Sequence, residues 1–108
     1  MTINSRRKGA SAERELSNLF KELGFTARRR QQYNGTDGSD DVCVEELEGE
    51  YFIECKAVQS INMHTVMDKA IEQCGSKKPL IFHKRNRKGW LVVMRPEDFF
   101  TLLMKGRQ

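Results

Sequence analysis

The chain has 108 residues, of which 31% are charged and 38% hydrophobic, and its formal net charge is +4. We expect one domain, residues 1–108, that folds without disulfides or zinc, because a chain of this length buries roughly 65% of its unfolded surface. No apolar stretch approaches the ~20 residues of a membrane span. The N-terminus also lacks the apolar stretch of a signal peptide. These features exclude a membrane protein and predict a cytoplasmic one.

The cysteines do not form a metal-binding pattern. Cys43, Cys55 and Cys74 are odd in number, lie far apart and include no C-x-x-C pair. A zinc site would need help from the distant His64 and His83. The spacing therefore predicts buried free thiols in a reducing compartment.

The charge is distributed unevenly along the chain. Residues 1–30 carry a net charge of +5, residues 31–60 a net charge of −7, and residues 61–108 a net charge of +6. An acidic middle between two basic flanks is typical of a carboxylate site within a surface that attracts polyanions. An uneven but solvated surface without function is the alternative.

The first half of the chain predicts a helix and a strand before a long loop. Apolar residues recur with helical spacing over residues 11–23, with Ser11 as a possible N-cap and Gly24 as the stop. Residues 25–30 are expected to form a short strand with a basic continuation. Residues 33–40 are rich in turn-forming residues and are predicted to be a loop.

The remaining elements complete the order αβββαββα, which predicts an α/β fold with one mixed sheet flanked by helices. The segments 41–44 and 51–56 are expected to form a hairpin around Glu48-Gly49. The later elements are a helix at 63–74, strands at 80–82 and 90–94, and a short helix that starts at Pro96.

The expected hairpin places three charged side chains together. A two-residue turn at Glu48-Gly49 sets Asp41 opposite Lys56, and directly paired residues share a face. Glu54 projects on that same face. The opposite face of the hairpin is then apolar and consists of Val42, Val44, Ile53 and Cys55.

Two interpretations of this charged face are open from the residues alone. One is a surface salt-bridge cluster, which contributes ~0–1 kcal/mol to stability. The other is a site for a divalent cation such as Mg²⁺, which prefers carboxylate and carbonyl oxygens. Glu13 and Glu15 flank the apolar stripe of the first helix, and periodicity does not decide which of them faces the sheet.

Three segments resemble the archaeal-type Holliday junction resolvases of the PD-(D/E)xK nuclease superfamily. They are RKGASAEREL at residues 7–16, SDDV at 39–42 and FIECK at 52–56. The resemblance implies a single nuclease domain with a restriction-endonuclease-like mixed central sheet. The chain departs from the wider superfamily at Asp40, where proline is frequent, and the loop before Ser39 is longer than in the shortest resolvases.

The same resemblance assigns roles to individual residues. It implies that Glu13, Asp41, Glu54 and Lys56 are catalytic. Asp41, Glu54 and the main-chain carbonyl of Cys55 would hold Mg²⁺, for which Mn²⁺ can substitute, and Glu13 would complete or orient this site. The DNA-binding residues expected from the basic segments and the family are Arg6, Arg7, Lys8, Arg28, Arg29, Arg30 and Ser39.

The implied function is a Mg²⁺-dependent endodeoxyribonuclease that resolves four-way DNA junctions by paired symmetric cuts. It would act on branched double-stranded DNA as a homodimer, without a small-molecule cofactor, in the cytoplasm or in that of the host if phage-encoded. One alternative is a nuclease of the same fold that acts on flaps, nicks or single strands. An alternative of another class is a catalytically silent DNA-binding module.

Two further surfaces are left open by the sequence. The basic turn with Lys84, Arg85, Arg87 and Lys88 is either a phosphate-binding element or a solvated turn. The last helix, with Phe99, Phe100 and Leu103, and the outer face of the second helix are candidates for the dimer contact. Both can equally belong to the core of one chain.

Overall fold

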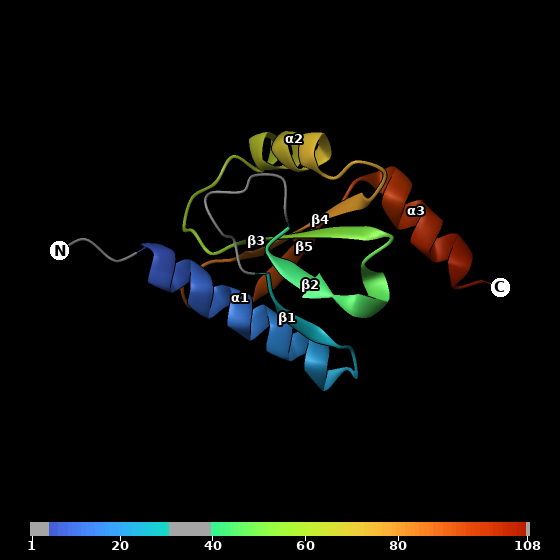
Figure 1. The fold of residues 1–108 in the computed structure, drawn as a ribbon. Helices are drawn as coiled ribbons and strands as arrows, with labels where there is room; N and C mark the ends of the chain where they lie inside the picture. The colour runs from blue at the N-terminus through green and yellow to red at the C-terminus, as the bar shows by residue number, and fades with distance from the viewer. Residues whose placement is uncertain (1–4, 31–39, 108) are drawn as a thin grey trace.

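The computed structural model describes residues 5–30 and 40–107, and its elements follow the expected αβββαββα order (Figure 1). The elements are α1 (Ser5–Glu22), β1 (Ala27–Arg29), β2 (Val42–Val44), the 3₁₀ helix η1 (Glu45–Leu47), β3 (Tyr51–Lys56), α2 (Met63–Gln73), β4 (Lys78–Lys84), β5 (Trp90–Val93) and α3 (Pro96–Lys105). Within the described part of the chain, no helix combines the length and the apolar character that crossing a membrane requires.

Helix α1 is longer than the sequence predicts. It begins by Ser5, so Ser11 lies inside the helix and the expected N-cap there is wrong. The apolar stripe is confirmed, because Ala12 and Leu16 are buried in the core. The helix ends as expected at Gly24, which adopts a φ of 95° that disfavours other residues and donates its N–H to the carbonyl of Lys21 at 2.9 Å.

The expected hairpin between the second and third strands is wrong. Strand β2 pairs antiparallel with β1, and residues 45–47 form the helix η1 in place of a two-residue turn. Because β1 takes one edge of β2, the other edge meets β3 near its start, where the N–H of Asp41 donates to the carbonyl of Ile53 at 2.9 Å. Asp41 is therefore not paired with Lys56 across two hydrogen-bonded strands, as the hairpin predicted.

The strands form two hydrogen-bonded ladders where one mixed sheet was expected. The smaller ladder is β1-β2, and the larger has the order β3-β4-β5. In the larger ladder β3 and β4 are parallel, because helix α2 connects them, whereas β4 and β5 are antiparallel and joined by a turn. The mixed character of the central sheet is confirmed.

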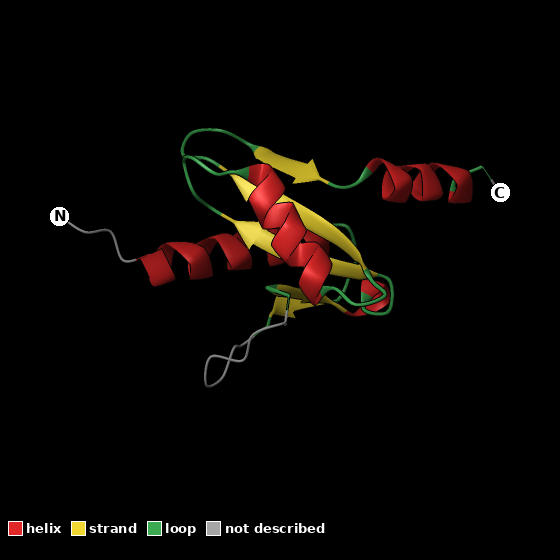
Figure 2. Cartoon of the chain, turned by 90° about the horizontal axis from the view of Figure 1, so that it is seen from above, coloured by secondary structure: helices red, strands yellow, loops and turns green. Residues whose placement is uncertain are grey.

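Helices cover the sheet on opposite faces (Figures 1 and 2). On the α1 side, Val42, Val44, Ile53 and Cys55 belong to one buried cluster, so the apolar face expected for these residues is confirmed. On the other face, Phe52 packs with residues of α2 in a second cluster. Side chains alternate along β3, so Glu54 lies on the same face as Phe52.

The cysteines and the ends of α2 agree with the sequence analysis. Cys43, Cys55 and Cys74 are buried and free. Helix α2 begins after Asn62, whose side chain accepts a hydrogen bond from the N–H of Thr65 at 3.1 Å. Residues 31–39, which include Ser39 and the expected loop at 33–40 except for Asp40, lie outside the described residues.

Candidate active site

The carboxylate of Asp41 is attached to the main chain of β3. Its Oδ2 atom accepts a hydrogen bond of 2.8 Å from the N–H of Cys55. Glu54 and Lys56 flank Cys55, and their side chains share one face of the strand. The structure thus brings together Asp41, Glu54 and Lys56 as expected, although by a contact between side chain and main chain rather than by a hairpin.

The acids at this position influence one another strongly. Burial and the Glu54 carboxyl, which shares a hydrogen bond with Asp41, raise the pKa of Asp41 to about 7. The N–H of Cys55 and the charge of Lys56 oppose this rise in the pKa but do not cancel it. Two adjacent buried carboxylates repel each other when both are ionised, so a cation that compensates their charge would favour the ionised form of both.

Glu13 approaches the pair from helix α1. Burial raises the pKa of Glu13, while a hydrogen bond of 3.0 Å from the Nε of Arg29 to its Oε1 lowers the pKa and the charge of Asp41 raises it. Cys55 lies within the influence of all three acids. Burial first, and then the charges of Asp41, Glu13 and Glu54, raise the pKa of the Cys55 thiol to about 12, so this thiol stays neutral.

Glu15 lies away from these acids, which decides between the two candidates on the first helix. Its carboxylate accepts hydrogen bonds from Lys84 at 2.5 Å and from the indole N–H of Trp90 at 2.9 Å. These bonds, the one from Lys84 first, lower the pKa of Glu15. Glu15 therefore ties α1 to the turn between β4 and β5, and Glu13 is the acid beside Asp41.

A cleft lies at the end of β3. It has a volume of about 410 Å³ and is lined by residues 8–9 of α1 and residues 55–59. Lys8 and Lys56 are both among the lining residues. The cleft thus joins a predicted DNA-binding lysine and the predicted catalytic lysine in one hollow next to the acids, where two ammonium groups can receive a phosphate.

The oxygen atoms of this site suit a hard divalent cation. Within residues 5–30 and 40–107, no three His, Cys, Asp or Glu side chains form a metal-binding cluster, and the Glu13 carboxylate is paired with Arg29. Asp41 and Glu54 nevertheless supply two adjacent carboxylates whose negative charge Lys56 compensates only in part. The N–H and C=O of one strand residue point to the same edge, so the Cys55 carbonyl also faces the Asp41 side. Such oxygens are typical Mg²⁺ ligands.

The three consecutive arginines of the predicted DNA-binding set each have an acidic partner. Arg28 lies 3.5 Å from Glu45 and is mostly exposed. Arg29 pairs with Glu13. Arg30 pairs with both Asp40 and Glu48. The structure therefore leaves Arg28 as the most accessible of the three for a phosphate.

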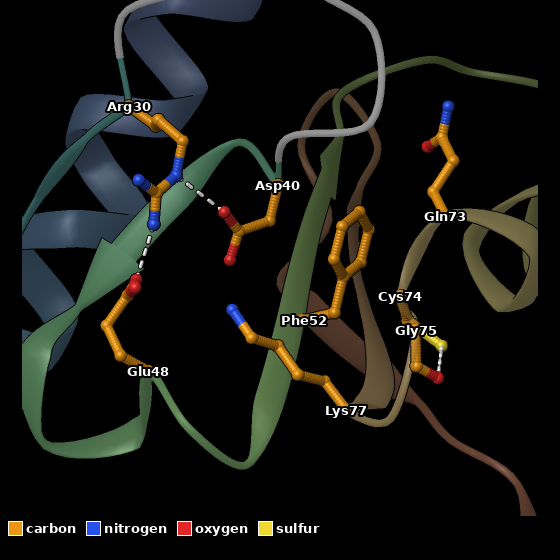
Figure 3. A pocket seen from close by; sticks show the side chains of 8 residues that line it. All are labelled: Arg30, Asp40, Glu48, Phe52, Gln73, Cys74, Gly75 and Lys77. Atoms are coloured by element: carbon orange, nitrogen blue, oxygen red, sulfur yellow. Dashed lines mark hydrogen bonds and ion pairs between the residues drawn. The ribbon is translucent and has the colours of Figure 1, made fainter.

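Arg30 and Asp40, the residues that border 31–39 on either side, form an ion pair in which the carboxylate is buried (Figure 3). The Nε of Arg30 lies 2.6 Å from Oδ1 of Asp40, which is 4% exposed, and the guanidinium also pairs with Glu48. Lys77 and Gln73 line the same cavity, which has a volume of about 290 Å³. Sequence reasoning noted Asp40 only as a departure from proline. No local sequence pattern marks this network, because Arg30, Asp40 and Glu48 lie on segments that only the fold brings together.

The remaining predicted DNA-binding residues are placed only in part. Arg6 and Arg7 lie in the first turn of α1, directly before Lys8, which lines the cleft. Ser39 lies outside the described residues. The basic turn with Arg85, Arg87 and Lys88 is exposed and lies between β4 and β5.

Comparisons with known proteins show the family and the fold of the chain. The profile of the family described as archaeal Holliday junction resolvase (hjc) matches residues 4–101. Among solved structures, the chain is similar to the Hjc Holliday junction resolvase of the archaeal hyperthermophile Archaeoglobus fulgidus, with 16% sequence identity and a TM-score of 0.59. That similarity covers 80% of this chain and 76% of the other, and it concerns the fold. No curated protein matches the chain by sequence.

Proposed function

Because the chain belongs to the archaeal Holliday junction resolvase family, we propose that it is a metal-dependent endodeoxyribonuclease that resolves four-way DNA junctions by paired symmetric cuts. The observation that supports the chemistry is the assembly of Asp41, Glu54 and Lys56 at the end of β3. Phosphodiester hydrolysis needs an activated water and stabilisation of the negative charge that develops on the phosphate. The acids and the lysine together provide groups for both needs.

The acidic residues would hold the metal. Asp41, Glu54 and the Cys55 carbonyl are its ligands in this proposal, with Mg²⁺ as the natural ion and Mn²⁺ as a substitute. A bound divalent cation supplies Lewis acidity, which polarises the phosphoryl oxygen and offsets charge in the transition state. Glu13 is the acid that completes or orients the site, and its orientation is fixed by Arg29.

The lysines would act on the phosphate and the water. Lys56 offsets the charge of the scissile phosphate and orients the attacking water. Lys8, which lines the same cleft, binds the scissile or adjacent phosphate. Arg6, Arg7 and Arg28 would extend the contact along the backbone, as phosphate contacts position a nuclease on its substrate. No residue of the chain forms a covalent intermediate in this mechanism.

Resolution of a junction into two duplexes requires two cuts. A single chain offers one such site, so we propose a homodimer whose two-fold axis coincides with that of the junction. Two sites related in this way cut opposite strands symmetrically.

A cleavage assay on four substrates tests this function. Labelled four-way junction, flap, nicked duplex and single-stranded DNA are incubated with the full chain in Mg²⁺, Mn²⁺ or EDTA, with Lys56→Gln as the inactive control. We expect metal-dependent, symmetric cutting that favours the junction. A preference for flaps, nicks or single strands would assign the other nuclease function, and binding without cutting in any metal would assign a DNA-binding module.

A further inference from the structure

The turn between β4 and β5 carries an exposed cationic group. We call Arg85, Arg87 and Lys88 the basic turn; all three are exposed. None of them forms an ion pair with any residue of the described part of the chain. This distinguishes them from Arg28, Arg29 and Arg30, whose charges are compensated by acids.

The backbone holds the basic turn in a defined shape. The N–H of Lys88 donates to the carbonyl of Arg85 at 3.1 Å. Arg87 has a φ of 62°, the left-handed region in which glycine or asparagine is usual. An arginine at such a position is unfavourable for the turn itself, so the turn geometry does not account for its presence.

The basic turn is also attached to the segment that leaves the active site. The side-chain oxygen of Gln59 accepts a hydrogen bond of 2.9 Å from the N–H of Asn86. The carbonyl of Val58 lies 2.8 Å from Nε2 of His83, at the end of β4. Val58 and Gln59 line the cleft that contains Lys56. The cations of the turn and the cleft are thus parts of one connected surface.

A second attachment comes from helix α1. Lys84 and Trp90, which precede and follow the turn, both bond to Glu15. The ammonium of Lys84 also lies over the Trp90 ring, 5.7 Å from its centroid. Because Lys84 is satisfied by these contacts, its charge serves the fold. The three cations beyond it are exposed, and the structure gives them no ion pair within the described part of the chain.

We propose that the basic turn is a second phosphate-binding site, which holds the sugar-phosphate backbone of a duplex arm beside the scissile phosphate. The proposal rests on the proposed function, because it needs a DNA substrate in the cleft. The ligand is a polyanion with regularly spaced charges, which three unpaired cations on a fixed loop complement. A site of this kind increases affinity for duplex DNA and carries no base specificity.

Substitution of the turn separates this role from a structural one. We would compare Arg85→Gln/Arg87→Gly/Lys88→Gln with the matched control Lys21→Gln/Lys69→Gln/Arg107→Gln, which removes the same charge at exposed positions elsewhere. Glycine at position 87 suits the positive φ, so the turn should keep its shape. The single variant Arg87→Gly keeps the experiment decisive if the triple variant folds poorly, as judged by circular dichroism.

The measurement is the salt dependence of binding to a labelled four-way junction in EDTA, by fluorescence anisotropy. Each phosphate contact contributes about −0.9 to the slope of log K against log salt. We expect the turn variant to flatten the slope by roughly 2 to 3 and Arg87→Gly by about 1.

An unchanged slope, or an equal change in the control, would overturn the proposal. Failure of the proposed function gives a different result, since the wild-type chain would then cut no branched DNA in any metal. A wild-type chain that cuts junctions while its turn variant binds them normally refutes the phosphate site alone.

Discussion

The main-chain N–H of Cys55 donates a hydrogen bond of 2.8 Å to Oδ2 of Asp41. This bond fixes the Asp41 carboxylate beside Glu54 without any pairing of β2 with β3 as strands. The position of Asp41 therefore depends on the main chain of β3, the strand that carries Glu54 and Lys56.

The acids should be required for cleavage but not for binding. In Asp41→Asn the amide oxygen still accepts the hydrogen bond of Cys55, so we expect a folded protein. Asp41→Asn and Glu54→Gln should both abolish cleavage in Mg²⁺, while the junction affinity stays equal or increases because negative charge near the DNA is removed. Gel assays of cleavage and anisotropy of binding measure the two properties. Near wild-type cleavage by either variant would contradict the metal site.

The stability of the metal-free protein should fall as the pH rises from about 4 to about 7. The folded pKa of Asp41, about 7, lies above its ordinary value of 3.8, so in this window the folded state binds more protons than the unfolded state. The contribution is at most about 1.4 kcal/mol per pH unit. Urea unfolding in EDTA at pH 5, 6 and 7 measures it, and Asp41→Asn should show a flatter profile. Identical profiles for the two proteins would contradict the raised pKa.

The charged face was predictable from the sequence, although the reason for it was not. The alternation of side chains along residues 51–56 correctly predicts that Glu54 and Ile53 lie on opposite faces of the strand. The predicted hairpin is wrong because residues 45–47 form a 3₁₀ helix and because β2 pairs with β1. No local sequence pattern marks the pairing of β1 with β2, because the two strands are far apart in the sequence. Glu48-Gly49, in contrast, resembles the turn of a hairpin.

Glu13 and Glu15 should differ sharply in their effect on catalysis. Glu13→Gln keeps an acceptor for Arg29 but removes the charge near Asp41, so we expect the cleavage rate to fall roughly 10–100-fold. Glu15→Gln loses an exposed ion pair with Lys84 and should lower stability by less than about 1 kcal/mol, with the rate within about twofold. Single-turnover rates and thermal unfolding report these effects. A greater loss of rate in Glu15→Gln would place the wrong acid at the site.

The arginine that follows β1 should stabilise the fold more than it binds DNA. Arg30→Met leaves the buried Asp40 without its partner, which we expect to cost about 3 kcal/mol of the free energy of unfolding. Adding Asp40→Asn should restore part of the loss, because the uncompensated charge is removed. Arg28→Ala, at an exposed position, should keep full stability and weaken junction binding. Urea unfolding compares the three variants with the wild type, and equal stability of Arg30→Met and wild type would refute the network.

Composition could not reveal that these arginines differ. Three consecutive cations indicate a phosphate-binding segment, but a strand alternates its side chains between two surroundings. Glu45, Glu48 and Asp40 reach them from segments that only the fold brings near. The partners of a charge, unlike its sign, depend on tertiary structure.

Helix α3 presents an apolar surface without a partner in the described chain. It extends away from the rest of the molecule (Figure 2), and its large apolar side chains are exposed. They are Phe99, Phe100, Leu102, Leu103 and Met104. The outer face of α2, the other candidate for the dimer contact, exposes Ile71 only partly. Of the two candidates, α3 has the larger apolar surface to bury.

The two-fold dimer should therefore depend on α3. A stable interface of this kind buries over roughly 1,000 Å² in total, which a projecting apolar helix can supply when it packs against a second copy. Light scattering at micromolar concentration should give about twice the chain mass of 12.5 kDa. Phe100→Glu/Leu103→Glu should yield a folded monomer that nicks a junction once, because its active site is untouched while the symmetric second cut is lost.

Ile71→Glu on α2 is the matched control and should remain a dimer. Dissociation by Ile71→Glu alone would move the contact to α2, and a wild-type monomer with and without junction DNA would refute paired cutting by a dimer.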